Sequence, residues 1–197
     1  MHRTAPALAL TLIIVALGAC TSTTTTGSGT TLSEGTVDLL HDGRQAAKAL
    51  AAIERAVGSS PARVVEVDFY PEYLIVEAQD PAVLDHIDRY EWRDGEVAPS
   101  APVELSGPQE AVTASLFPTS AVRWTRLAAM VADAERAALH NTPLRIEEPH
   151  ANYVFVERST SPADDGRVLV RIYLEGPRRS GSVEMTATGD IRSVNVS

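Results

Sequence analysis

The chain has 197 residues, with 17 basic and 26 acidic side chains, a formal net charge of −9 and a single cysteine. The acidic balance disfavours nucleic acid and anionic lipid headgroups as partners, because both carry negative charge. One cysteine excludes an intramolecular disulfide, and the length suits one domain or two small ones.

The first 20 residues have the pattern of an export signal. Arg3 gives a basic start, residues 5–17 are almost entirely apolar, and the run is followed by the only cysteine, Cys20. A run of this length matches the apolar core of a signal peptide and is too short to cross a bilayer about 30 Å thick as a helix. The pattern therefore predicts an exported protein.

The end of this run, Leu17-Gly18-Ala19-Cys20, resembles the lipobox of bacterial lipoproteins. The resemblance implies that residues 1–19 are removed as a lipoprotein signal peptide, that Cys20 is acylated, and that lipid holds the mature protein at a membrane. Two or three acyl chains suffice for stable anchoring, since each buried CH₂ contributes about 0.8 kcal/mol. The alternative is an ordinary secretory signal that leaves one free cysteine.

The residue after the cysteine bears on the location of the protein. Thr21 resembles the sorting pattern of outer-membrane lipoproteins, because an aspartate would retain the protein at the inner membrane. We expect the protein in the cell envelope, at the outer membrane facing the periplasm if the cell has two membranes. In a cell with one membrane it would lie on the outer face of the plasma membrane.

Residues 20–37 form a segment rich in threonine, serine and glycine, and Leu32 is the only large apolar residue between positions 21 and 36. Such a segment cannot bury enough apolar surface to offset the entropy that ordering costs. We expect it to be a flexible tether between the lipid and the rest of the chain.

The remaining chain has the pattern of a helix followed by strands, and this pattern occurs twice. Apolar residues recur at helical spacing once in each half, and the first of the two helices should end at Gly58. The apolar positions are Ala46, Leu50, Ile53 and Val57 in the first half, and Leu127, Val131, Ala134 and Ala138 in the second.

Alternating apolar and polar residues predict several strands after each helix. The predicted strands are 65–69, 73–77, 86–93 and 96–97 in the first half, and 144–146, 153–157, 168–175, 181–187 and 191–196 in the second. The fold class we expect is α+β, with two tandem units at residues 38–107 and 108–197. Each unit would be one helix packed on a three- or four-stranded antiparallel sheet, and the pattern leaves open whether the two units share one continuous sheet.

A helix followed by an antiparallel meander with a glycine turn, here Thr188-Gly189-Asp190, resembles the PepSY-type module. Two such units in tandem are similar to the β-lactamase-inhibitor-protein-like fold of exported bacterial proteins. The resemblance implies a periplasmic or extracellular module that contacts another protein or its own partner domain and uses no cofactor.

The sequence contains no motif that predicts catalysis. No Gly-x-Ser-x-Gly and no histidine pair at metal-ligand spacing is present, and adjacent carboxylates on a strand point to opposite faces. His150 beside Glu147 and Glu148 could form a weak metal site, and Asp164-Asp165-Gly166 could bind calcium or shape a turn. We expect no catalytic residue, no metal and no cofactor.

Two groups of residues are candidates for binding a partner. Tyr70, Tyr73 and Trp92 could anchor a protein if they lie on an exposed sheet face, and they belong to the core if they face a helix. Arg178 and Arg179 lie in a turn and could clamp a carboxylate or phosphate, or simply pair with nearby acids.

These observations favour a membrane-anchored lipoprotein that acts as a non-catalytic protein- or ligand-binding module, with another envelope protein as the expected partner. A structural or assembly component of an envelope complex and a small-ligand sensor are the alternatives. An enzyme fits the sequence least.

Overall fold

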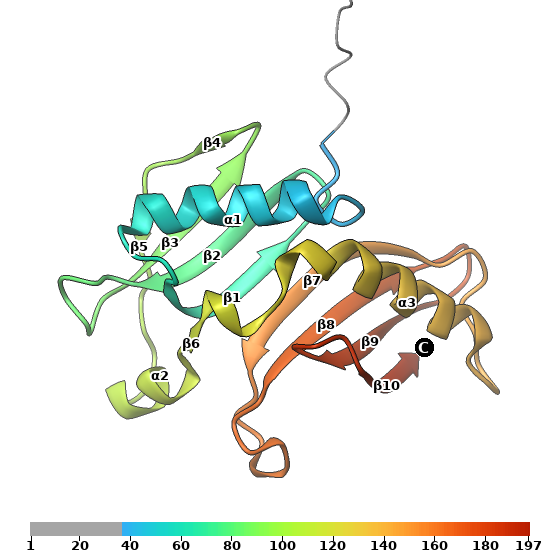
Figure 1. Cartoon of the computed structure of the whole chain (residues 1–197). Coiled ribbons are helices and arrows are strands. Elements are labelled where there is room, and N and C mark those ends of the chain that lie inside the picture. The colour runs from blue at the N-terminus through green and yellow to red at the C-terminus, as the bar shows by residue number, and fades with distance from the viewer. Residues whose placement is uncertain (1–36) are drawn as a thin grey trace, which may run out of the picture. The chain divides into compact units, whose positions relative to one another are not determined.

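Residues 37–197, the part of the chain that the computed structural model describes, contain three α-helices and ten β-strands (Figure 1). The helices are α1 (Gly43–Val57), α2 (Gln109–Ser115) and α3 (Leu127–His140). The strands are β1 (Arg63–Phe69), β2 (Tyr73–Gln79), β3 (Ile87–Arg93), β4 (Glu96–Val97), β5 (Ala101–Pro102), β6 (Phe117–Pro118), β7 (His150–Arg158), β8 (Val168–Glu175), β9 (Ser180–Thr186) and β10 (Ile191–Val196). Three short 3₁₀ turns are η1 (Thr119–Ala121), η2 (Trp124–Arg126) and η3 (Pro162–Asp164). The predicted signal peptide, Cys20 and almost all of the predicted tether lie outside the described residues.

All ten strands belong to one antiparallel sheet, so the prediction of two tandem units, each one helix packed on a three- or four-stranded sheet, is wrong. The strand order is β10-β9-β8-β7-β1-β2-β3-β4, with β5 paired to β3 and β6 paired to β1. The two predicted halves meet where β1 pairs with β7 and Val67 lies opposite Val156. This pairing satisfies backbone groups that two separate sheets would leave unpaired at their edges.

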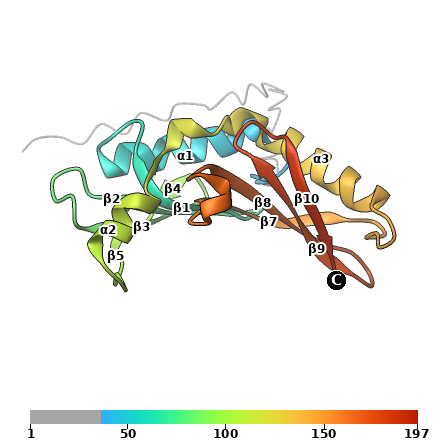
Figure 2. The same ribbon diagram turned by 90° about the horizontal axis from the view of Figure 1, so that it is seen from below.

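The two predicted helices are confirmed, and both lie against the same face of the sheet (Figure 2). The Asp42 side chain caps α1 by accepting hydrogen bonds from the backbone N–H of Arg44 and Gln45, which also lowers the pKa of Asp42. Gly58 ends α1 in the left-handed conformation, with a φ of 82°. None of the helices within residues 37–197 has the length and hydropathy needed to span a membrane.

A single hydrophobic core fills the space between these helices and the sheet. It contains residues from both predicted halves. For example, the ring centres of Phe69 in β1 and Trp124 in η2 are 5.4 Å apart. The two helices therefore share one core, in agreement with the single sheet that the strand pairing shows.

Two strand predictions need correction in detail. Residues 144–146 form no strand, and Ile146 instead buries its side chain from the loop that precedes β7. In β1 a register irregularity between Val64 and Glu66 shifts the alternation, so Val64 is fully buried and Val65 only partly. A bulge of this kind places one extra residue in a strand and cannot be read from alternation alone.

Candidate functional site

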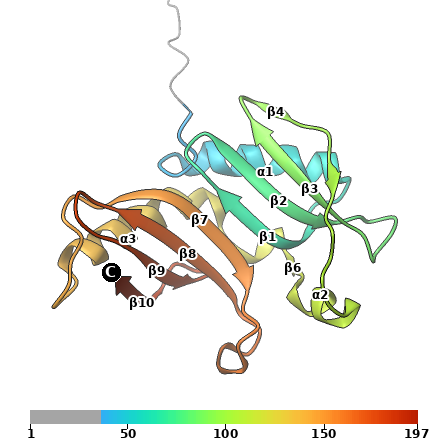
Figure 3. The same cartoon turned by 180° about the vertical axis from the view of Figure 1, so that it is seen from behind.

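The candidate site lies on the face of the sheet that points away from α1 and α3, which we call the outer face. Viewed from behind, the strands of the sheet lie in front of these two helices (Figure 3). Side chains alternate between the two faces of a strand, so every second residue of each strand points to the outer face. Polar and aromatic residues occupy most of these positions.

Four tyrosines form a continuous stack across the outer face. The ring of Tyr70 lies 4.3 Å from that of Tyr73 and 5.5 Å from that of Tyr153, which in turn lies 4.1 Å from Tyr173. The three interplanar angles are 12°, 16° and 9°, so the rings are close to parallel. All four rings are partly buried.

Strand register explains this stack. Tyr153 in β7 is paired with Tyr173 in β8, and Tyr70 directly follows the β1 residue that pairs with Val154. Neighbouring strands are about 4.8 Å apart, which is close to the spacing of stacked rings. Tyrosines at neighbouring positions on β2, after β1, on β7 and on β8 therefore come close enough for their rings to stack.

The first end of the stack is closed by a cation. Arg93 in β3 pairs with Tyr73 in β2, and its guanidinium carbon lies 4.2 Å from the centre of the Tyr73 ring. The negative face of an aromatic ring attracts a cation placed in this way.

Burial in the stack, together with the neighbouring Tyr173, raises the pKa of Tyr153 to about 12. The Tyr153 hydroxyl therefore keeps its proton at neutral pH.

The other end of the stack opens into a hollow of about 490 Å³, which we call the Tyr173 hollow. Tyr173 and Tyr153 form one side of it, and Ser182 in β9 and Asn195 in β10 lie across from them. Asn152 and Glu175 also line it, and the Asn152 amide nitrogen donates a 2.8 Å hydrogen bond to a Glu175 carboxylate oxygen.

A cluster of carboxyl groups lies beside the stack on the outer face. Burial, followed by a hydrogen bond with Asp68 and its charge, raises the pKa of Glu66 to about 7. Burial also raises the pKa values of Asp68, Glu77 and Glu157, while Arg89 offsets part of this shift for Asp68 and Glu77. Glu66 therefore holds a proton at a pH where an exposed glutamate would be ionised.

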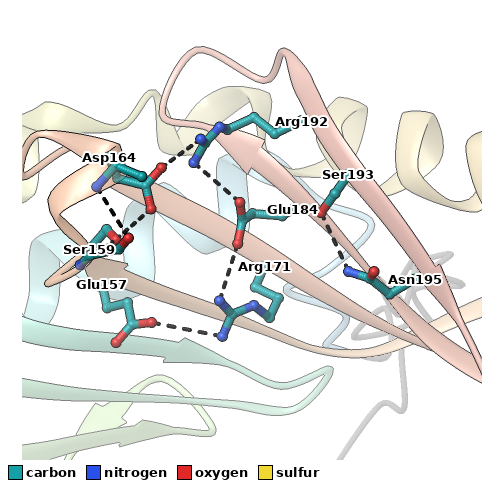
Figure 4. Close-up of polar contacts among 10 residues, drawn as sticks. Glu157, Ser159, Asp164, Arg171, Glu184, Arg192, Ser193 and Asn195 are labelled. Carbon is teal, nitrogen blue, oxygen red and sulfur yellow. Dashed lines mark hydrogen bonds and ion pairs between the residues drawn. The ribbon is translucent and has the colours of Figure 1, made fainter.

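A chain of ion pairs continues this polar surface over β7 to β10 (Figure 4). The Arg171 guanidinium lies between Glu157 at 3.8 Å and Glu184 at 3.2 Å. Arg192 extends the chain from Glu184 at 3.2 Å to Asp164 at 2.6 Å. Charges of alternating sign on adjacent strands satisfy one another, so this part of the outer face is already paired internally.

The protonation of Glu66 predicts that the fold loses stability as the pH rises. In the unfolded chain Glu66 ionises near its ordinary pKa of 4.5, whereas in the fold it keeps its proton to about 7. The folded state thus binds more protons between these values, and stability present below the lower value is lost as the pH rises through the upper one. We expect unfolding to require about 1–2 kcal/mol more at about pH 5.5 than at about pH 8, after allowing for solvent screening of this partly buried group.

Urea unfolding at the two pH values tests this expectation. The Glu66→Gln variant should lose most of the pH dependence and be the more stable protein at the higher pH, because no charge is then forced into the cluster. Glu96→Gln is the control, since Glu96 is exposed in β4. An undiminished pH dependence in Glu66→Gln would contradict the assignment of the shifted proton to this side chain.

The structure separates the binding residues that the sequence predicted. Tyr70 and Tyr73 lie together in the stack on the outer face. Trp92 faces the helices and is 7% exposed within the hydrophobic core, which leaves it no surface for a partner. Arg178 and Arg179 lie in the turn between β8 and β9, where they line a second hollow of about 320 Å³ together with Arg145 and Glu147.

Tyr153 and Tyr173 are functional candidates that the sequence analysis did not identify. Both fall on the outer face of predicted strands, and the segment 153–157 has the same Tyr and Glu ends as 73–77. This similarity could have identified Tyr153 as a counterpart of Tyr73. It could not show that the rings of Tyr70 and Tyr153 stack, because their contact depends on the pairing of β1 with β7.

Within residues 37–197 no group of three or more histidine, cysteine or acidic side chains is arranged to hold a metal ion.

No protein-family model matches the chain, and no curated protein or solved structure shows significant similarity to it. The resemblances to lipoproteins and to PepSY-type modules therefore stay predictions.

Proposed function

We propose that this chain is a lipid-anchored protein of the bacterial cell envelope that binds another envelope protein through its outer face, without catalysis. The observation that carries the proposal is the stack of four tyrosines across the outer face. Tyrosine rings held rigidly by their neighbours offer a large contact area at a small entropic cost, which is typical of binding hot spots.

The placement in the envelope is supported by the lipobox-like sequence that ends at Cys20. Replacing Cys20 with serine should move the protein from the membrane fraction to the soluble fraction, because the acyl chains supply the membrane affinity. Mass spectrometry of the unmodified protein should show acyl groups on Cys20 and a chain that begins there. If the unmodified protein carries no acyl group and is already soluble, the placement fails.

The binding role is testable by site-specific photocrosslinking in intact cells. A photoreactive phenylalanine at position 73 should capture a discrete partner, whereas the same residue at position 139 should not. Leu139 is the matched control because it is exposed on α3, which packs against the opposite face of the sheet.

The captured partner then has to bind the purified protein. Truncating an anchor ring usually costs about 2 kcal/mol or more, so Tyr73→Ala should weaken binding by about thirtyfold. Equal capture from both positions, or unchanged affinity of the alanine variant, would overturn the proposed use of the outer face. Turnover of an envelope substrate by the purified protein would overturn the non-catalytic role.

A further inference from the structure

The tyrosine stack is part of a longer row that crosses seven strands. Register places Arg93 beside Tyr73 in β3 and β2. Tyr70, which follows β1, joins this pair to a second run in β7 to β10, made of Tyr153, Tyr173, Ser182 and Asn195. Planar groups occupy the row from Arg93 to Tyr173. At Ser182 the row has a short side chain, and the Tyr173 hollow lies there.

The size of this interruption fits one flat group. Tyr173 pairs with Ser182 and Ser182 pairs with Asn195, so Tyr173 and Asn195 are two strand spacings apart, or about 9–10 Å. A planar group that stacks on Tyr173 would lie about 3.5–4 Å from its ring, within the distance to Asn195. It would continue the stack parallel to the existing rings.

The chemistry of the lining favours a cation with several hydrogen-bond donors. Glu175 is the only charged residue among the described residues that line the Tyr173 hollow. Asn152 also lines the hollow, and its amide nitrogen donates its hydrogen bond to Glu175, which leaves the other carboxylate oxygen of Glu175 for a cation. Ser182 and Asn195 add a hydroxyl and an amide.

The first end of the stack already shows which planar cation this surface accepts. Arg93 places its guanidinium over Tyr73 at 4.2 Å. A guanidinium is flat, permanently charged and carries five donors, whereas an ammonium is a strongly hydrated point charge. The free face of Tyr173 presents the same ring chemistry at the opposite end.

We propose that the Tyr173 hollow binds the guanidinium group of an arginine side chain on the partner protein, stacked on Tyr173 and hydrogen-bonded to Glu175. This inference rests on the proposed function, for which it names the recognised group. Arg178 and Arg179 line an adjoining hollow together with Glu175. Their positive charges therefore weaken the attraction of Glu175 for a cation.

Binding of the capped peptide Gly-Arg-Gly to the purified full chain tests the proposal. The shift of the Tyr173 ring signals in NMR spectra reports occupancy of the hollow even for weak binding. The same peptide with citrulline keeps the shape and loses the charge, and should bind about 2- to 30-fold more weakly, as expected for loss of a cation–π contact. Gly-Lys-Gly should also bind more weakly than Gly-Arg-Gly, because an ammonium is not planar.

Variants of the hollow provide a test that depends on the sign of charge. Glu175→Gln should weaken binding of the arginine peptide, and Arg179→Gln should strengthen it, each by a few-fold. Ser182→Tyr should fold, since tyrosine favours a strand, and should abolish binding by filling the hollow with a fifth ring. Tyr173→Ala should also abolish binding, and the filled variant keeps the test informative if the alanine variant does not fold.

Several results would overturn the inference. These are equal binding of the citrulline peptide, equal or tighter binding of the lysine peptide, tighter binding of the neutral sugar N-acetylglucosamine, and undiminished binding to Ser182→Tyr. If position 73 still captures an envelope partner while the hollow variants leave its affinity unchanged, the proposed function stands and only the guanidinium site is wrong. If the arginine peptide binds as expected but position 73 captures nothing in cells, the hollow is confirmed and the proposed function fails.

Discussion

Replacing Phe69 with alanine is expected to lower the free energy of unfolding by about 3–5 kcal/mol. The ring is fully buried at the end of β1 and lies 5.4 Å from the ring of Trp124. Its removal leaves a cavity where a central strand meets the segment that leads into α3. Because this is one core, we also expect the whole of residues 37–197 to unfold in a single transition.

Two tryptophans make this expectation measurable. Trp92 reports on β3 and Trp124 on η2, so variants that keep only one of them follow the two predicted halves separately. Their urea transitions should coincide in the unmodified protein and shift together in Phe69→Ala. Leu84→Ala is the control, because Leu84 is 64% exposed. Separate transitions for the two reporters would contradict a single core.

Alanine in place of Gly43 is expected to destabilise the protein by about 1–3 kcal/mol. In the interior of an unobstructed helix the same change would stabilise by about 1 kcal/mol, so the sign of the effect is informative. Gly43 is buried at the start of α1, and a Cβ there would lie 2.5 Å from the backbone carbonyl oxygen of Thr125. A backbone atom cannot turn aside as a side chain can, so η2 would have to move away from α1.

Gly58→Ala separates steric contact from backbone strain. Gly58 has a φ of 82° and no atom within 4 Å of the Cβ position, so alanine there costs only the left-handed conformation, about 1–2 kcal/mol. Near-ultraviolet circular dichroism should show a changed environment of Trp124 in Gly43→Ala and none in Gly58→Ala. A stabilised Gly43→Ala variant would show that α1 and η2 do not pack as described.

The candidate site was partly predictable from the sequence. Tyr70 and Tyr73 were candidates because aromatic residues surround a turn, and the structure places them on the outer face. Trp92 had the same aromatic character but falls on the inner face of β3, where the helices cover it. A strand pattern shows which residues share a face, but it does not show which face meets a helix.

The shifted pKa of Glu66 was not predictable from the sequence at all. Glu66 alternates with apolar residues and has the appearance of an ordinary solvent-exposed glutamate. Its pKa rises because burial and Asp68 act on it once β2 and β7 flank β1 on both sides. Desolvation depends on neighbours that are distant in sequence, and local spacing does not reveal them.

The sequence by itself determined where α1 and α3 lie and where most of the longer strands lie, within a few residues at their ends. These features depend on residues close together in the chain, through apolar spacing, strand alternation and the Gly58 end of α1. Only the tertiary structure decided that β1 pairs with β7, which joins the predicted halves into one sheet and brings Tyr70 against Tyr153. Either half could satisfy its local pattern alone, and the choice of one sheet comes from pairing two strand edges and burying one shared core.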